Sequence, residues 1–113
     1  MLPRVNRVTR PADFRAVIRR GRRVAATNAI LHVLHREQQG PSRLGFVVAK
    51  SVGNAVTRNL VKRRLRAAGI DVIAMMGDGV DVVIRALPAS AEASWATLHA
   101  EITEGIKMEM ARA

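Results

Sequence analysis

The segment Lys50–Arg66 restricts what this chain can fold into more than any other part of it. Wound at 3.6 residues per turn from Ala55 to Ala68, it separates polar from apolar side chains. Its polar side carries Arg58, Asn59, Lys62, Arg63 and Arg66, and its opposite side carries Val56, Val61, Leu65 and Ala68. Gly69 follows as a typical stop signal. The segment therefore predicts an amphipathic helix with one face in a hydrophobic core and the other at the surface.

The polar side of this helix is cationic and has no neutralising partner nearby in the sequence. Cations one turn apart repel one another by about 0.2–0.5 kcal/mol per pair, and no Asp or Glu occurs from Leu44 to Ile70. Phosphates relieve this repulsion, because each neutralised phosphate releases condensed counterions. A merely soluble basic face normally has acids interspersed, so we expect a polyanion-binding surface. Gly53 and Asn54, just before the helix, fit either plain capping or a backbone anion site.

Positive charge is concentrated in the first part of the chain. There are 16 Lys or Arg against two acids from Met1 to Ile70, and three against seven from Asp71 to Ala113, which together give +10. Most of these cations are Arg, whose planar fork binds phosphate bidentately and stacks on bases. A coding bias towards Arg is the alternative explanation, and the clustering argues against it. The distribution predicts a nucleic-acid partner.

The remaining segments predict an α+β fold with helices on a small mixed sheet. A first helix should start at Pro11, place Phe14, Val17 and Ile18 on one face, and stop at Gly21. Two β-type runs, Ala29–Leu34 and Leu44–Ala49, flank turn-forming residues, so we expect them to pair antiparallel.

The last third of the chain contains one further strand and one further helix. After an ambiguous stretch at 71–76 and a turn at 77–79, Val80–Ala86 is typical of a buried strand. A final helix should follow from Trp95, with Ser94 as its cap. Its predicted buried stripe consists of Trp95, Leu98, Ile102 and Ile106.

Length and composition predict a single domain over residues 1–113, with residues 1–10 as a basic, partly flexible arm. The absence of Cys excludes disulfides, thiolate metal sites and cysteine nucleophiles. No apolar run approaches the ~20 residues needed to cross a bilayer, and the first residues lack the apolar segment of a signal peptide. We therefore expect a cytoplasmic protein without a membrane partner.

Several motifs, taken in order, resemble the bacterial ribonuclease P protein family from near Asn6 to about Met108. They are a basic arm with NRV, a DF-containing first helix ending in GRR, RLGFVVAK, VGNAVTRN-x-x-KR-x-x-R, and DVVIRALP. Each piece is weak alone, but their order and spacing together are highly specific.

This resemblance implies a two-layer α/β sandwich in the order α-β-β-β-α-β-α, as in the second domain of ribosomal protein S5. Its βαβ crossover would be left-handed, against the strong right-handed default. The implied function is that of the protein subunit of ribonuclease P, an endoribonuclease that removes the 5′ leader of precursor tRNA. Hydrolysis, with Mg²⁺ held by the RNA, would belong to the catalytic RNA. The implied complex contains one protein monomer per ribonuclease P RNA, and precursor tRNA as substrate.

The resemblance also assigns residues. The side chains implied to bind the RNA subunit are Arg58, Asn59, Lys62, Arg63 and Arg66, and those implied to bind the leader are Phe14, Ile18, His32 and Lys50. Three departures from the family pattern stand out. Leu60 replaces a usual Arg while Arg64 stands one turn on, so the charge could be displaced along the helix. Ile18 and His32 occupy cleft positions that are often aromatic, which weakens the base stacking expected there.

Other functions are less compatible with the sequence. Protein-borne catalysis would need converging side chains, but His32 and His35 have opposite parity on a strand and His99 lies on the acidic last helix. We therefore predict no catalytic and no metal-binding residue. A structural RNA binder such as a ribosomal protein would share the charge pattern. A DNA-binding module is a third alternative, but the sequence offers no second short helix that could form a helix-turn-helix with Ala55–Ala68.

Overall fold

The computed structural model describes residues 2–112, and local sequence signals mark the starts of all three α-helices. In chain order they are η1 (Arg4–Asn6), α1 (Pro11–Arg20), β1 (Arg22–Ala25), β2 (Ala29–His35), β3 (Arg43–Val47), η2 (Lys50–Val52), α2 (Ala55–Val72), η3 (Ile73–Met75), β4 (Val80–Ala86), η4 (Pro88–Ala91) and α3 (Trp95–Ala111). Side-chain caps start two helices: Asn54 Oδ1 accepts from Thr57 N at 2.9 Å, and Ser94 Oγ accepts from Thr97 N at 3.1 Å. The first helix has Pro at its start, as predicted.

The four strands form one mixed sheet in the order β1-β2-β4-β3. β2 pairs antiparallel with β1 and β4, and β3 pairs parallel with β4. The antiparallel pairing predicted between β2 and β3 is therefore wrong, because β4 lies between them. Consecutive strands usually pair as a hairpin, but here the 36–42 loop joins β2 to β3 across the end of β4. Reasoning from residues alone also missed β1, which only the family resemblance supplied.

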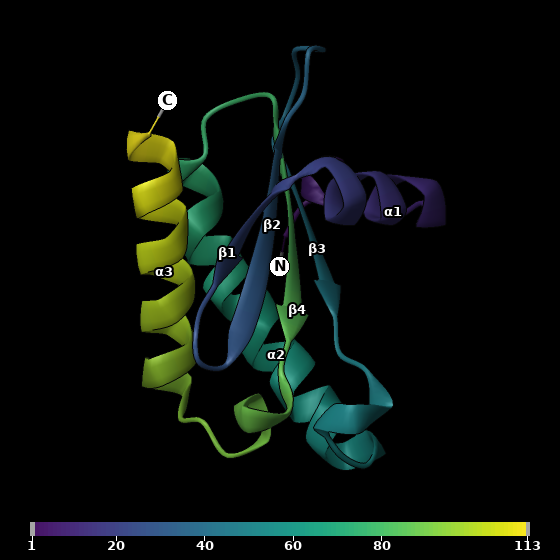
Figure 1. Ribbon diagram of the computed structural model, residues 1–113, viewed down its shortest axis with the longest axis vertical. Helices are drawn as coiled ribbons and strands as arrows, with labels where there is room; N and C mark the ends of the chain where they lie inside the picture. The colour runs from purple at the N-terminus through teal and green to yellow at the C-terminus, as the bar shows by residue number, and fades with distance from the viewer. Residues whose placement is uncertain (1, 113) are drawn as a thin grey trace.

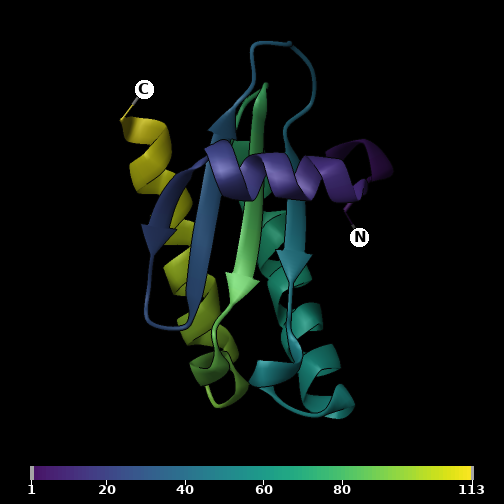
Figure 2. The same cartoon turned by 45° about the vertical axis from the view of Figure 1, so that its right-hand side comes forward.

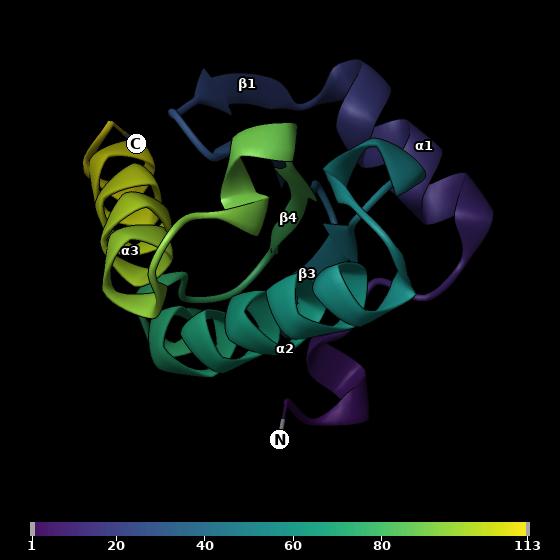
Figure 3. The ribbon, with the colours of Figure 1, turned by 90° about the horizontal axis from the view of Figure 1, so that it is seen from below.

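The helices cover both faces of the sheet unequally. Figure 2 shows α1 crossing one face near its upper end, while α2 and α3 lie behind the other face. Figure 3 shows α2 and α3 side by side on that second face. The sheet and this helix pair are the two layers of the predicted sandwich, and one hydrophobic core lies between them. Its fully buried side chains include Leu31, Val82, Leu65 and Ile102.

The connection β3-α2-β4 is a left-handed crossover, as the resemblance implied. In Figure 2 both strands point downward, and the chain passes from β3 on the right, through α2 behind the sheet, to β4 on the left. Right-handed connections account for nearly all parallel βαβ units, so no general rule would have predicted this one. The crossover places α2 on the sheet face opposite α1, and the side of α2 that points away from the sheet faces solvent.

Three local predictions were wrong, and each error has a packing cause. Gly69 does not end α2, because it lies inside the helix where a Cβ would approach Phe46 Cζ to 2.9 Å. Trp95 is 39% exposed and lies against the His99 ring, centroid to centroid at 5.0 Å, instead of entering the core. Val56 is 79% exposed because the first turn of α2 extends past the sheet, as the lower part of Figure 1 shows.

The basic arm follows the outer edge of β3. Val8 N donates to the Leu44 carbonyl at 2.9 Å, and Asn6 Nδ2 donates to the Ser42 carbonyl at 2.8 Å. Leu2 and Val8 are both buried. The arm therefore contributes apolar contacts as well as charge, which its alternating basic and apolar residues permit.

Candidate nucleic-acid interface

The solvent side of α2 presents the four predicted cations and one amide, which together we call the basic face: Arg58, Asn59, Lys62, Arg63 and Arg66. Burial of Val61, Leu65 and Ala68 against the sheet fixes the rotation of the helix about its axis. Asn59, Arg63 and Arg66 are exposed, and Arg58 and Lys62 are half-buried. Among residues 2–112, none of these four cations has an acidic partner within ion-pair distance. The sequence thus predicted the face correctly as a surface feature.

Arg58 has an additional polar group that its own surroundings leave unsatisfied. Its Nε atom is buried, and no hydrogen-bond acceptor for it is found within the described part of the chain. A buried donor without a partner costs roughly 1–3 kcal/mol. An acceptor arriving from outside, such as a phosphate oxygen, would remove that cost.

Arg64 does not extend the basic face. Its Nη1 donates to the Ala93 carbonyl at 2.7 Å, which directs the guanidinium towards the start of α3. Leu60, one turn earlier, is partly exposed. The hypothesis that Arg64 carries a charge displaced from position 60 is therefore not supported, because Arg64 is occupied in joining two helices.

Three of the four predicted leader-binding residues lie where α1 covers the sheet: Phe14 and Ile18 on α1, and His32 on β2. Arg23, His32, Val83 and Gly45 are consecutive partners across β1, β2, β4 and β3, so their side chains or Cα atoms form one row. The Phe14 ring of α1 lies over Gly45, where an added Cβ would meet Phe14 Cε1 at 2.6 Å. Ile18 is one helical turn beyond Phe14 and is half-buried. Lys50 lies past the end of β3, exposed on η2.

His32 is the least expected member of this row. It is only 4% exposed, and both ring nitrogens are buried without a hydrogen-bond partner in the described residues. Burial, followed by the positive charges of Arg85 and Arg23, lowers the pKa of His32 below its ordinary value of 6.5. The imidazole is therefore neutral near pH 7, and both of its nitrogens are covered by neighbouring protein atoms.

A sequence model of the ribonuclease P family matches residues 2–109. The chain is 43% identical to the ribonuclease P protein component of Clavibacter michiganensis subsp. michiganensis, covering 94% of both proteins. It is 46% identical to that of Arthrobacter sp. (strain FB24), covering 99% of this chain and 82% of the relative. The chain belongs to the ribonuclease P protein family. It is thus a protein component of ribonuclease P, an endoribonuclease of tRNA processing.

Solved ribonuclease P proteins share its fold. A Staphylococcus aureus RNase P protein mutant superposes with a TM-score of 0.83 at 24% identity, covering 92% of this chain and 87% of that one. The Thermotoga maritima RNase P protein superposes with a TM-score of 0.78 at 21% identity, covering 90% and 96%. The family resemblance recognised in the sequence is confirmed, and so is the sandwich.

Reasoning from the sequence missed two cations that flank His32 on the sheet. Arg23 on β1 pairs with His32, and Arg85 on β4 lies two residues from its other partner, Val83. Both carry charge close enough to His32 to lower its pKa. The motif DVVIRALP contained Arg85, but only the β2–β4 register, which the sequence does not reveal, brings it to this face.

The described residues contain no group of three or more His, Cys, Asp or Glu side chains that could hold a metal ion. The histidines themselves are separated: His32 is inside the α1 face of the sheet, His35 ends β2, and His99 on α3 lies 2.9 Å from an Asp71 carboxylate oxygen. Within residues 2–112, no helix has both the length and the apolar content needed to cross a membrane.

Proposed function

We propose that this component of ribonuclease P binds the catalytic RNA subunit through the basic face of α2. The observation that carries the proposal is that four cations lie together on a surface helix without any acidic partner among residues 2–112. Their mutual repulsion is unrelieved within the described protein, and RNA phosphates would relieve it with release of counterions. The buried, unsatisfied Nε of Arg58 supports the same partner.

We further propose that the face of the sheet beneath α1 holds the single-stranded 5′ leader of precursor tRNA. Phe14 and Ile18, which are half-buried, would contact bases directly, and the neutral His32 ring would stack once leader binding uncovers it. Arg23 and Arg85 would neutralise leader phosphates on either side of His32. Lys50 would act further along, past the end of β3.

Phosphodiester hydrolysis is assigned by this proposal to the RNA, with Mg²⁺ bound there. The protein would act as a monomer in a 1:1 ribonucleoprotein in the cytoplasm. Its own residues would do two things: neutralise phosphates where RNA helices and substrate approach one another, and hold the leader in an extended form. The first of these lowers the electrostatic cost of bringing two polyanions together.

The deciding experiment is cleavage of precursor tRNA by a ribonuclease P RNA at limiting Mg²⁺, with and without the protein. We expect the protein to increase cleavage strongly, because its cations replace part of the screening that Mg²⁺ otherwise provides. A matched substrate with a leader of one nucleotide should gain less. If cleavage does not increase although the protein still binds RNA, a purely structural RNA-binding role, as in a ribosomal protein, would replace this proposal.

A further inference from the structure

The outer edge of β3 is only partly covered by the arm. Leu44 directs its backbone outward, since its carbonyl accepts from Val8 N, and alternate residues of a strand direct these groups to the same side. Phe46 therefore also directs its N–H and C=O outward. Within residues 2–112 neither group has a hydrogen-bond partner on that side. The edge thus presents one donor and one acceptor next to an aromatic ring.

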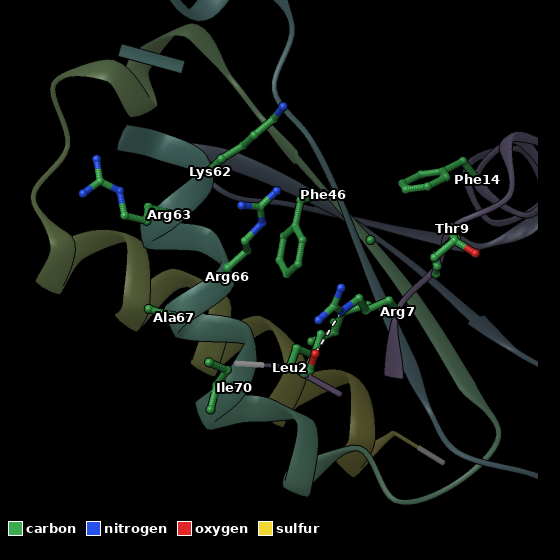
Figure 4. Close-up of a pocket in the computed structure, with 13 residues that line it drawn as sticks. Leu2, Arg7, Thr9, Phe14, Phe46, Lys62, Arg63, Arg66, Ala67 and Ile70 are labelled. Carbon is green, nitrogen blue, oxygen red and sulfur yellow. Dashed lines mark hydrogen bonds between the residues drawn. The ribbon is translucent and has the colours of Figure 1, made fainter. Parts of the chain in front are cut away.

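A pocket of about 600 Å³ opens at this edge, between α2, β3 and the arm. The residues that define its chemistry are Arg7, Phe14, Phe46, Lys62, Arg63 and Arg66, and its lining contains no acid. Figure 4 shows Arg66 and Arg7 directing their guanidinium groups into the space beside Phe46, with Phe14 on the far side. Arg7 is held there by a 2.8 Å hydrogen bond from its Nε to the Leu2 carbonyl.

This combination of groups fits one nucleotide. An aromatic ring offers a surface on which a base can stack, the Phe46 backbone offers a donor and an acceptor to the edge of a base, and two guanidinium groups offer charge to its phosphates. The volume lies within the range of small-molecule sites, roughly 300–1,000 Å³. A peptide of acidic residues would satisfy the cations but leave the flat Phe46 surface without a matching partner.

We propose that this pocket receives a single unstacked nucleotide of the RNA subunit, with its base against Phe46 and its phosphates between Arg7 and Arg66. The inference rests on the proposed function, because Lys62, Arg63 and Arg66 belong to both the pocket and the basic face. An RNA that lies along α2 therefore passes the pocket mouth. The leader would lie on the other side of the β3 edge: His32 and Arg23 are on the α1 face of the sheet, whereas the Phe46 side chain is on the α2 face, and Phe14 borders both spaces.

The test combines a Phe46→Leu variant with chemical probing of unpaired bases in the ribonuclease P RNA, in the absence of any precursor tRNA. We expect wild-type protein to protect one unpaired nucleotide that stays reactive with the variant. We expect RNA affinity to fall by about 5- to 100-fold, as for the loss of one stacked base. The salt dependence should not change, because no charge is removed. Trp95→Leu, which removes a partly exposed aromatic ring on α3, should change neither protection nor affinity.

A second measurement keeps the proposal testable if Phe46→Leu fails to fold. The chain contains only two Phe, so wild-type protein labelled with 4-fluorophenylalanine gives two fluorine resonances. Adenosine 5′-monophosphate should shift the Phe46 resonance saturably, whereas ribose 5-phosphate and an oligoglutamate peptide, which offer only charge, should shift it much less. Equal shifts with the peptide would overturn the assignment to a base.

The outcomes separate this inference from the function on which it rests. Tight RNA binding by both wild type and Phe46→Leu, with identical protection patterns, would sink the pocket assignment and leave the docking of α2 on RNA intact. A wild-type protein that does not bind the RNA at all would sink both.

Discussion

His32 shows how one residue can link the stability of this protein to its site. Its strand position was clear from the sequence, but its burial and its two cationic neighbours were not, because they depend on strands joined only in the folded sheet. The ring that we propose as a base contact is also a buried group whose pKa the fold lowers.

We predict that the protein loses stability on mild acidification through His32. In the unfolded chain the imidazole takes up a proton near pH 6.5, whereas the folded protein resists protonation until lower pH. The unfolded state therefore binds more protons below that value, and the free energy of unfolding falls as pH falls. Between about pH 7.5 and about pH 5.5, denaturant titrations should show a steeper loss for wild type than for His32→Phe. Parallel pH profiles would contradict the prediction.

The same variant tests the leader assignment. A phenyl ring at position 32 stacks on a base without two unsatisfied nitrogens beside it, so leader-bearing precursor tRNA should bind more tightly than to wild type, by up to about tenfold. Titration of fluorescent precursor tRNA with the reconstituted ribonucleoprotein measures this. Mature tRNA, which has no leader, is the control and should bind both proteins equally.

Gly45 allows α1 to approach the sheet. A Cβ at this position would be 2.6 Å from Phe14 Cε1 and 3.0 Å from Val8 Cβ, so Gly45→Ala forces the Phe14 ring away. We expect a loss of about 1–3 kcal/mol in the free energy of unfolding, measured by urea denaturation. Adding Phe14→Leu should recover part of it, since the two substitutions affect one contact. Strictly additive losses would show that the contact is not the cause.

At the level of the elements, the sequence predicted where most helices and strands lie along the chain, but it did not predict which strands pair. The period of α2, its cap at Asn54, and the span of β4 follow from local patterns, and all three match the structure. Gly69 misled because a glycine after an apolar stripe usually ends a helix, whereas here it accommodates Phe46. The β2–β3 pairing misled because local signals cannot show that a later strand lies between them.

The basic face of α2 should dominate the salt dependence of RNA binding. Replacing Arg58 or Arg63 with Ala should lower affinity for the RNA subunit and reduce the slope of log affinity against log salt concentration by about one each. Arg64→Ala is the matched control, since it removes the same charge from the same helix but from a side chain bound to the Ala93 carbonyl. Filter binding over a salt series would decide. An equal change of slope for Arg64 would show that only net charge matters.

On the scale of the whole molecule, positive and negative charge are concentrated in different parts of the sequence. Of the 19 cations 16 lie in the segments up to Ile70, and seven of the nine acids lie after it, where several of them hold the fold together. Asp81 pairs with Arg36 and Arg43, Glu101 accepts from Asn28, and the buried Glu109 pairs with Arg22. These three acids are therefore held in internal contacts away from the basic face and do not neutralise it.

We predict that the assembled protein improves substrate binding more than the chemical step. Under the proposed function, cations on two faces would reduce repulsion between the RNA subunit and precursor tRNA, whereas His32, His35 and His99 lie apart in the described residues and form no catalytic group. Single-turnover cleavage should therefore show a lower substrate concentration at half-maximal rate, with a nearly unchanged rate at saturation. A protein that altered only the saturating rate would oppose this view.

The order of the strands has a consequence for synthesis on the ribosome. β4 is the last strand to be made, yet it is one of the two inner strands and pairs with both β2 and β3. A nascent chain that ends before Val80 leaves those two strands with no common neighbour and α2 with no completed surface to cover. The arginine-rich helix α2 is therefore synthesised before the strand that completes the surface on which it packs. The sheet can form fully only after Ala86, the last residue of β4, has left the exit tunnel. Truncations upstream of that point should be degraded as unfolded chains instead of accumulating as small domains.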